Sequence, residues 1–380
     1  MKRSFLAMML AAVMLLAAAC GNNGGNNGGS NAGETNADAN TGSGTKSDQL
    51  KVVLLIPGTL GDKSFFDAAN SGLTQVRDVL QADTKVIEMG VDTSKWEPTF
   101  NSVAAQDWDV IISGGSQITE LLNATAEQHP DKKFINYDTD IPETASNVYA
   151  ISYATNEVSF LAGAAAALTS VSDMPNVNAD KKIGFLGGMD IPGINQFLVG
   201  YIEGAKYAVP DIKVAVSYAG DFADPGKGKE LSLLQYNSGV DVIFNVAGGT
   251  GLGVFDAAKE KSQYAVGVDS DQAAMIADSD EDKANLIITS AVKKIDQAIL
   301  RAVRGIQAGT LEMGKLETVG LKEDGVGIVR NSIFESVVSE DVKAQVLEVE
   351  KKLIAGEIEV SNAIGMETSE IEQIRNAVKP

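Results

Sequence analysis

The chain has 380 residues but only one cysteine and one histidine. A single thiol excludes an internal disulfide, and zinc or iron sites built from cysteine and histidine have no ligand set. A Ser-His-Asp triad would depend on His129, which stands beside Pro130 in a predicted loop. Basic residues are also scarce, with 31 Lys and Arg against 51 Asp and Glu and a net charge of −20. Binding to a nucleic-acid backbone is therefore disfavoured.

The N-terminus has the pattern of a secretory signal. Met1-Lys2-Arg3 is basic, and residues 5–19 are apolar and end in small side chains. This apolar segment is shorter than the roughly 20 residues that a membrane-spanning helix needs. We therefore interpret residues 1–19 as a signal peptide.

Cys20 follows directly, in Leu16-Ala17-Ala18-Ala19-Cys20-Gly21. This segment resembles the bacterial lipobox, although Ala17 stands where that motif usually has leucine. The resemblance implies that Cys20 is acylated, for example with palmitate, and anchors the protein to the extracytoplasmic face of the cell membrane. The alternative is an ordinary signal peptide followed by a cysteine without a role.

Residues 20–48 are almost entirely Gly, Asn, Ser, Thr and Ala with scattered charges. Such a composition buries too little apolar surface to offset chain entropy, and it is typical of a disordered linker. We expect it to tether a folded module to the anchor. The remaining residues are too many for one simple core and indicate two domains.

Short apolar segments alternate with helical patterns along the folded part. The predicted strands are residues 51–56, 85–89, 110–113, 133–137, 147–153, 182–186, 213–218, 240–245, 264–269 and 285–290. The predicted helices are residues 64–80, 117–128, 157–170, 192–209, 226–237, 251–261 and 293–308. This alternation predicts α/β lobes with parallel sheets covered by helices on both faces.

Two β-α-β sets are present, and each opens with a strand that enters a glycine-containing loop. Ligands of open parallel sheets lie at the carboxyl ends of the strands, so two facing sheets predict a cleft between two Rossmann-like lobes. We assign residues 49–154 plus 270–313 to the first lobe and residues 155–269 plus 314–380 to the second. Several short crossings between them would form the hinge.

Five segments carry a family resemblance. They are Gly61-Asp62-Lys63-Ser64-Phe65 and residues 156–163, 183–192, 247–254 and 267–272. In this order and spacing they resemble the basic membrane lipoprotein family, also called Bmp or PnrA-like, from about residue 51 to residue 315. The resemblance implies a type I periplasmic binding protein that captures a purine nucleoside (inosine, guanosine or adenosine) for ABC permease subunits. It implies neither enzyme activity nor a cofactor.

A nucleoside requires an aromatic platform for its base and polar groups for its base edge and ribose. The resemblance assigns stacking to Phe65, and Phe222 in a polar loop is the predicted second face. Each phenylalanine has an alternative, as a core residue at the start of a helix or as a side chain packed under its own turn.

The polar candidates follow strands. The resemblance assigns the base edge to Asp138 and the ribose to Asp269 and Lys293. Asp138 could instead be a solvated turn residue, Asp269 an N-cap and Lys293 a surface lysine. Gly248 would allow close approach of backbone NH groups.

Ser116 and Gln117 offer a hydroxyl and an amide, although helix capping would also explain both. Two positions depart from the family pattern: an aspartate is expected where Ile56 or Pro57 stands, and an asparagine where Phe66 stands. These departures leave the ligand class open.

Two other functions stay possible on the sequence. One is a type I binding protein for a sugar or a signalling ligand, and the other is a surface nucleoside hydrolase with Asp269 and Asp271 as its candidate carboxylates. The negative charge and the single anchor favour a monomer.

Overall fold

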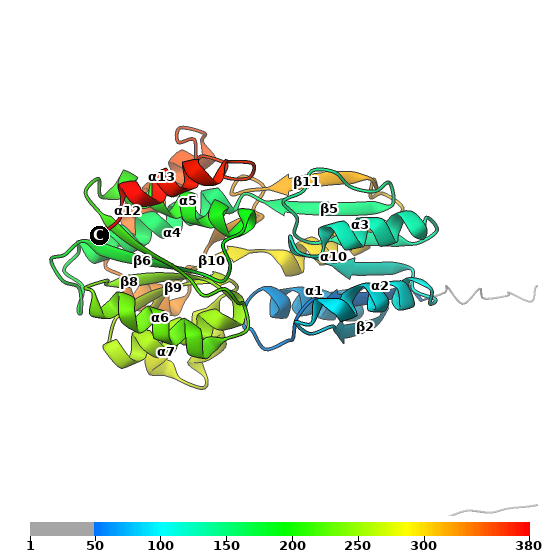
Figure 1. The fold of residues 1–380 in the computed structure, drawn as a ribbon, viewed down its shortest axis with the longest axis horizontal. Helices are drawn as coiled ribbons and strands as arrows, with labels where there is room; N and C mark the ends of the chain where they lie inside the picture. The colour runs from blue at the N-terminus through cyan, green and yellow to red at the C-terminus, as the bar shows by residue number, and fades with distance from the viewer. Residues whose placement is uncertain (1–48) are drawn as a thin grey trace, which may run out of the picture. The chain divides into compact units, whose positions relative to one another are not determined.

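The computed structural model describes residues 49–380. The predicted signal peptide, the linker and the lipidation site Cys20 lie outside the described residues. Residues 49–380 form two six-stranded sheets, each with helices on its two faces, as shown in Figure 1. The predicted fold class of two α/β lobes with mainly parallel sheets is confirmed.

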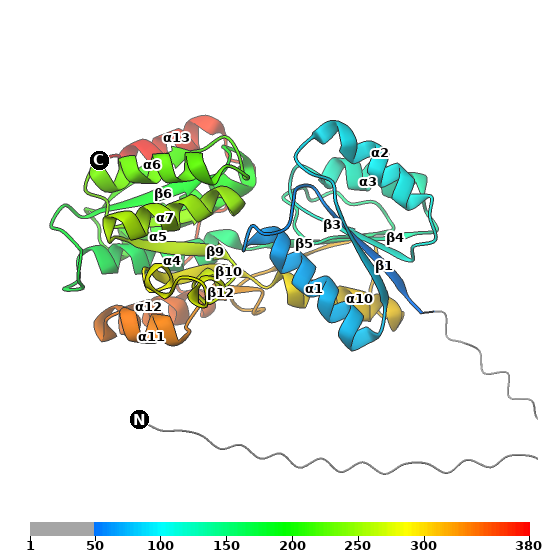
Figure 2. The ribbon, with the colours of Figure 1, turned by 90° about the horizontal axis from the view of Figure 1, so that it is seen from below.

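The first sheet has the strand order β11-β5-β4-β3-β1-β2, and all its neighbouring strands are parallel. Its strands are β1 (Lys51–Ile56), β2 (Asp83–Glu88), β3 (Val110–Ser113), β4 (Lys133–Asn136), β5 (Val148–Tyr153) and β11 (Lys315–Val319). Helices α1 (Phe65–Leu80) and α10 (Ile295–Gln307) cover one face, while α2 (Trp96–Ala104) and α3 (Thr119–Gln128) cover the other (Figure 2).

Strand β1 shows why this sheet needs helices on both faces. Val52, Leu54 and Ile56 belong to the hydrophobic cluster that includes α1, whereas Val53 and Leu55 belong to the cluster that includes α2. Successive side chains of a strand point to opposite faces, so a fully apolar strand is buried only when both faces are covered.

The second sheet has the order β12-β10-β9-β8-β6-β7, with β12 antiparallel to β10 and the other pairs parallel. Its strands are β6 (Lys182–Gly187), β7 (Lys213–Tyr218), β8 (Val242–Val246), β9 (Tyr264–Asp269), β10 (Ile287–Lys293) and β12 (Val326–Ile328). The accompanying helices are α4 (Thr155–Ser170), α5 (Pro192–Ala208), α6 (Pro225–Asn237), α7 (Leu252–Lys261), α8 (Gln272–Ala277), α9 (Glu281–Ala284), α11 (Ser332–Val337), α12 (Glu340–Ile354) and α13 (Thr368–Ala377). Two 3₁₀ turns, η1 (Thr93–Lys95) and η2 (Gly248–Gly251), follow β2 and β8.

Helices α4 and α5 pack closely because glycine lies at their contact. A Cβ atom on Gly204 would stand 1.9 Å from the carbonyl oxygen of Phe160, and one on Gly163 would stand 2.1 Å from that of Tyr201. Side chains at these positions would force the helices apart. The close approach lets α4 be buried along nearly its whole length.

The expected division into lobes is wrong at its later boundaries. Strand β10 pairs with β9 in the second sheet, and β11 pairs with β5 in the first. Figure 1 shows the orange β11 beside the blue-green β5, although the two are far apart in the sequence. The first lobe is therefore residues 49–153 plus 294–319, and the second is residues 154–293 plus 320–380. Strand pairing over this distance depends on tertiary contacts that no local pattern specifies.

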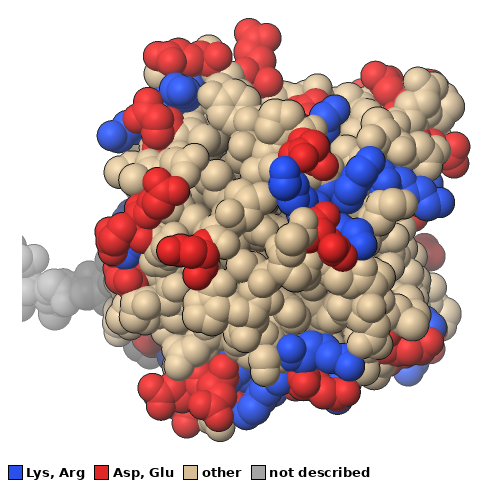
Figure 3. Space-filling view, turned by 90° about the vertical axis from the view of Figure 1, so that its left-hand side faces the viewer, with Lys and Arg blue, Asp and Glu red and all other residues tan. Residues whose placement is uncertain are grey.

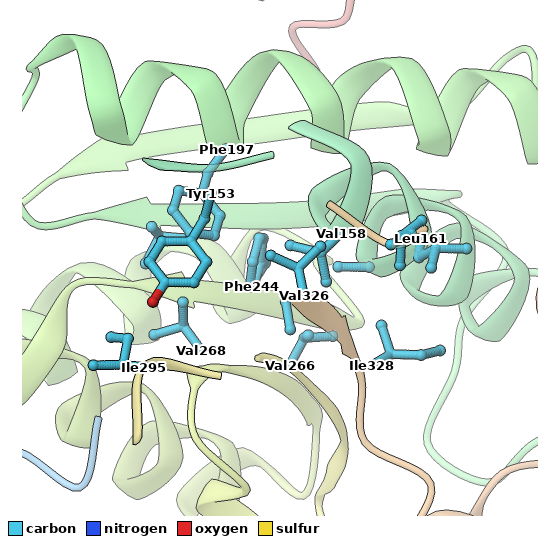
Figure 4. Close-up of a cluster of buried hydrophobic side chains, with 14 of the residues drawn as sticks. Tyr153, Val158, Leu161, Phe197, Phe244, Val266, Val268, Ile295, Val326 and Ile328 are labelled. Carbon is cyan, nitrogen blue, oxygen red and sulfur yellow. The ribbon is translucent and has the colours of Figure 1, made fainter. Parts of the chain in front are cut away.

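A buried cluster supports the central strands of the second sheet (Figure 4). Phe244 from β8 and Val266 from β9 are fully buried, and Val158 from α4 and Ile328 from β12 pack into the same cluster. This packing fixes the carboxyl end of β9, where Asp269 lies. Asp269 is therefore held at the end of a packed strand.

Charges on the surface are mixed in sign. Figure 3 shows basic side chains beside acidic ones on the outer end of the second lobe. Ion pairs of this kind include Lys181 with Asp211 and Lys182 with Asp180. Among residues 49–380, no helix has the length and apolar character needed to cross a membrane.

Candidate ligand-binding site

A cavity of about 590 Å³ lies between the two lobes, at the carboxyl ends of their strands. Its walls come from loops of both sheets, so its shape depends on how the lobes close. Every predicted ligand-binding residue lines it: Phe65, Ser116, Gln117, Asp138, Phe222, Gly248, Asp269 and Lys293. The structure brings these residues together, while their contact with a ligand stays a prediction.

Lys293 lies at the centre of the polar part of this cavity. It is the last residue of β10, and its side chain is only 6% exposed. Its Nζ atom lies 2.8 Å from Asp138 Oδ2 and 3.2 Å from Asp269 Oδ1. The alternative of a surface lysine is therefore wrong. The contact with Asp138, which follows β4 of the first lobe, was not anticipated from the sequence.

Burial and neighbouring charges shift the pKa values of Lys293 and Asp138. Burial acts to lower the pKa of Lys293, but the attraction of Asp138 and Asp269 outweighs it, and the pKa lies above the ordinary lysine value. Burial raises the pKa of Asp138, and the neighbouring Lys293 only partly opposes that change. The lysine therefore carries its positive charge at neutral pH and binds carboxylates or hydroxyls as a donor.

Asp269 has an unusual backbone, and its two carboxylate oxygens have different partners. Its φ of 62° lies in the left-handed region, which a non-glycine residue seldom adopts. The Ser64 hydroxyl donates a 2.6 Å hydrogen bond to Oδ2, whereas the buried Oδ1 forms an ion pair at 3.2 Å with Lys293 Nζ and accepts no hydrogen bond. The alternative role as an N-cap belongs to Asp271, which accepts a hydrogen bond from the Ala274 NH.

The two predicted stacking residues come from opposite lobes. Phe65 begins α1, and its ring lies 4.7 Å from Lys293 Nζ and 5.2 Å from the Tyr137 ring centroid. Phe222 lies in the loop after β7, where its ring packs onto Gly188: a Cβ atom there would stand 2.3 Å from the ring. Both rings keep part of their surface toward the cavity.

Gly248 opens η2 with a φ of 54°, a conformation that favours glycine. The adjacent Gly249 brings this turn close to the other lobe, because a Cβ atom on it would stand 3.8 Å from Asp62 Cβ. The glycines therefore let two backbone segments meet at one edge of the cavity.

Ser116 and Gln117 lie where the lobes approach each other. The Gln117 amide donates to Met189 Sδ at 3.4 Å, and a Cβ atom on Gly193 would stand 3.2 Å from Ser116 Oγ. Neither caps α3, whose N-cap is Ile118 without a side-chain cap. The capping alternative is therefore wrong for both residues.

The two departures from the family pattern also line the cavity. Pro57 follows β1, and the Phe66 ring packs onto Gly58, with its Cε2 atom 2.3 Å from where a Cβ of that glycine would stand. Phe66 also makes an edge contact with Phe65, with 5.5 Å between ring centroids. An aromatic wall thus occupies the place where the resemblance led us to expect an asparagine.

Three aromatic lining residues were missed by the sequence analysis: Tyr153, Phe197 and Trp96. Tyr153 ends β5, and its hydroxyl is buried without a hydrogen-bond partner. The rule that ligands lie at the carboxyl ends of strands could have identified Tyr153, because it ends a predicted strand. Trp96 and Phe197 have no comparable signal.

Asp62 binds the N–H groups at the start of α1. Its carboxylate accepts hydrogen bonds from the NH groups of Ser64, Phe66 and Asp67. Burial raises its pKa to about 6 even though these three donors oppose the shift. Asp62 therefore fixes the helix that presents Phe65 to the cavity. Within residues 49–380, no group of three or more His, Cys, Asp or Glu residues is placed to hold a metal ion.

Comparison with known proteins places this chain in a family. The family model Bmp, described as "ABC transporter substrate-binding protein PnrA-like", matches residues 49–363. The chain belongs to the Bmp family. It is a substrate-binding protein of the ABC transporter type, and its lobes have the architecture of solute-binding proteins.

Named Bmp relatives are similar over most of the chain. Basic membrane protein A of Borreliella burgdorferi is 31% identical over 84% of this chain and 90% of its own length. "ABC transporter nucleoside-binding protein BmpA" of Lactococcus lactis is 29% identical over 84% of this chain and 91% of its own length. A solved ABC transporter solute-binding protein of Aeropyrum pernix K1 is 25% identical, with a TM-score of 0.74, over 87% of this chain and 97% of that chain.

Proposed function

We propose that this Bmp-family protein captures a purine nucleoside, with inosine, guanosine and adenosine as the candidates, and delivers it to the permease of an ABC importer. The observation that carries the proposal is the buried group of Asp269, Lys293 and Asp138 beside the Phe65 ring. It combines hydroxyl-binding charges with an aromatic surface in one cavity. The name of the Lactococcus relative supports the same ligand class.

The ribose would occupy the charged part of the cavity. Asp269 Oδ1 is buried and paired only by charge with Lys293 Nζ at 3.2 Å, so it can still accept a hydrogen bond from a ribose hydroxyl. Lys293 carries three N–H donors and can donate one to the same sugar. A hydroxyl placed between the two groups would hydrogen-bond to both, which makes its binding favourable.

The base would lie between Phe65 and Phe222. Offset stacking of aromatic rings adds about 0.5–1.5 kcal/mol to the gain from burial. Asp138 would accept a hydrogen bond from an NH group of the base, since its other contact is the single ammonium of Lys293. The backbone at Gly248 would approach the ligand closely from the second lobe.

Closure of the lobes would complete the site. Direct contacts already join them: Ser64 donates to Asp269, Lys63 Nζ donates to the Met275 carbonyl at 3.1 Å, and Gln117 donates to Met189. Three chain segments connect the lobes, near residues 154, 294 and 320. A ligand that contacts both lobes favours the closed form by its added contacts.

We also propose that the mature protein acts as a monomer held at the extracytoplasmic face of the membrane by acylated Cys20. The support is the signal-like segment 1–19 and the lipobox-like residues around Cys20. A linker of the composition of residues 20–48 would keep a captured ligand near the permease. Mass spectrometry of the mature N-terminus tests this: acyl groups on Cys20 are expected, and an unmodified Cys20 would refute the anchor.

Calorimetric titration of the protein with inosine, guanosine, adenosine, cytidine and ribose tests the ligand class. We expect the purine nucleosides to bind and free ribose to bind far more weakly. Binding of ribose or another sugar alone would replace the nucleoside assignment by the sugar alternative. Conversion of a nucleoside to base and ribose during the titration would instead favour a hydrolase.

Asp269→Asn tests the proposed ribose contact. Asparagine tolerates the left-handed backbone, so the fold should persist. Loss of a charged acceptor should weaken nucleoside binding by about 10- to 100-fold. Asp324→Asn is the matched control, because Asp324 also has a left-handed φ of 57° but is exposed and does not line the cavity. Equal affinities of the two variants would contradict the role of Asp269.

A further inference from the structure

The cavity has an apolar end that the proposed contacts leave unused. Its wall is formed by Leu60, Phe66, Val91 and Trp96, which we call the apolar recess. These residues follow β1 and β2 or belong to the helices that come next. Asp138 of the charged group instead follows β4, which is separated from β1 by β3. The Phe65 ring links the two parts of the cavity, with its centroid 4.7 Å from Lys293 Nζ and 5.5 Å from the Phe66 centroid, so the recess borders the proposed base platform.

Three N–H groups around the recess already have hydrogen-bond partners. The Leu60 NH donates to Glu88 Oε2 at 2.8 Å, and the Gly61 NH donates to Asp67 at 2.8 Å. Trp96 Nε1 donates to the Gly90 carbonyl at 2.8 Å. The wall therefore presents carbon surface to a ligand, apart from the hydroxyls of Thr59 and Thr93.

The nearest carboxylate does not change this picture. Asp62 also lines the cavity, but both of its oxygens accept hydrogen bonds from the NH groups at the start of α1. A polar base edge entering the recess would lose its water without gaining matching partners, which is unfavourable. An apolar group would lose no hydrogen bonds to water and would cover exposed hydrocarbon.

The recess does have hydrocarbon to cover. Val91 is 67% exposed at its rim, and Leu60 and Phe66 are only partly buried. Because the recess opens into the same cavity as Phe65 and Lys293, the group that fills it belongs to the same ligand. The part of a purine that points away from the ribose is the six-membered ring with its 6-substituent.

We propose that the apolar recess binds an apolar substituent on the 6-amino group of the base, so that the protein prefers N6-alkylated or N6-aralkylated adenosine to adenosine itself. This inference rests on the proposed nucleoside function and narrows its substrate class. A secondary 6-amino group keeps one N–H, so the substituent removes only one of the two amino donors. Each buried methylene adds about fourfold in affinity, so a benzyl group should add at least about tenfold.

Competitive calorimetry of the full chain with adenosine and N6-benzyladenosine tests the inference. The expected result is tighter binding of N6-benzyladenosine by about tenfold or more. Equal or weaker binding of the benzyl compound, with adenosine still bound, overturns the inference and leaves the nucleoside function intact. Binding of neither compound, with the protein folded, refutes the nucleoside function on which the inference rests.

Variants test whether the preference for N6-benzyladenosine over adenosine depends on the recess. Phe66→Asn and Val91→Asp each place a polar group in the recess, and Val91 is exposed, so its replacement leaves folding intact. Both should reduce the ratio of the two affinities to about threefold or less. Val79→Asn is the matched control, since Val79 lies exposed on α1 with Phe66 but outside the cavity. An unchanged ratio in Val91→Asp and Phe66→Asn, as in the control, would overturn the assignment to the recess.

Discussion

Replacement of Lys293 by methionine should destabilise the protein more than any loss of a surface ion pair. Methionine is similar in length and fits an apolar environment, but it removes the cation that lies 2.8 Å from Asp138 and 3.2 Å from Asp269. Two carboxylates then share a buried site without a counter-ion. Removal of one partner from a buried ion pair lowers the free energy of unfolding by about 3–5 kcal/mol.

The stability loss in Lys293→Met should also depend on pH. In the variant, at least one carboxylate should bind a proton more tightly in the folded state than in the unfolded state. Its contribution to stability is then greatest at low pH and is lost as the pH rises through the raised pKa. We therefore expect a small deficit of Lys293→Met relative to wild type near pH 4 and the full deficit near pH 8.

Urea unfolding, followed by tryptophan fluorescence and circular dichroism, measures these free energies. Lys294→Met is the control, because the adjacent Lys294 pairs with Asp324, whose side chain is 82% exposed. That replacement should change stability by less than about 1 kcal/mol. Adding Asp138→Asn to Lys293→Met should restore part of the loss, since it removes one uncompensated charge.

Two results would refute this reasoning. One is a loss in Lys293→Met no larger than that in Lys294→Met at pH 8. The other is a double variant whose loss equals or exceeds the sum of the two single losses. Either would show that the three groups are not coupled in the folded protein as their distances indicate.

Further predictions concern the walls of the cavity. Because burial raises the pKa of Asp62 to about 6, this group alone should make the protein about 2 kcal/mol less stable at pH 7 than near pH 4. Asp62→Asn should remove that part of the pH dependence in urea unfolding, and an unchanged slope would contradict it. Tyr153→Phe removes a buried hydroxyl without a partner, so it should leave stability unchanged or raised; if a nucleoside uses that hydroxyl, its affinity measured by calorimetry should fall about fivefold to tenfold, and an equal affinity would exclude the contact. Gly188→Ala places a Cβ atom 2.3 Å from the Phe222 ring and should displace the ring. We expect weaker nucleoside binding with little change in the unfolding midpoint. Unchanged binding would exclude Phe222 as a stacking residue.

Much of the architecture could be predicted from local pattern. Every strand predicted from apolar segments is present, with ends shifted by a few residues. The elements not predicted include helix α2 and everything after residue 308, namely β11, β12, α11, α12 and α13. Lys315–Val319 alternates weakly, and Trp96–Ala104 contains a proline and polar residues. Strand β10 was predicted but placed in the wrong lobe. Its own residues are equally suited to either sheet, and only its pairing with β9 decides.

The residues of the candidate site could be predicted in part, but their contacts could not. Asp138, Asp269 and Lys293 could be selected from strand ends and from the resemblance, and they do lie in one cavity. The contact of Lys293 with Asp138 could not be derived, because the two residues are 155 apart in the sequence and come from different sheets. Trp96 and Phe197 went unrecognised because nothing in their local sequence indicates that they border a ligand, whereas Tyr153 could have been found as the last residue of a predicted strand.

By itself the sequence determined the class of each element, the acidic character, the signal-like N-terminus and the family. Those properties follow from composition, from hydrophobic period and from short motifs, all of which are local. Only the tertiary structure decided which strands share a sheet, that Lys293 holds two carboxylates, and that Phe66, Leu60, Val91 and Trp96 form one recess. The physical reason is that these facts depend on the packing of two lobes, where residues far apart in the chain meet within a few ångströms.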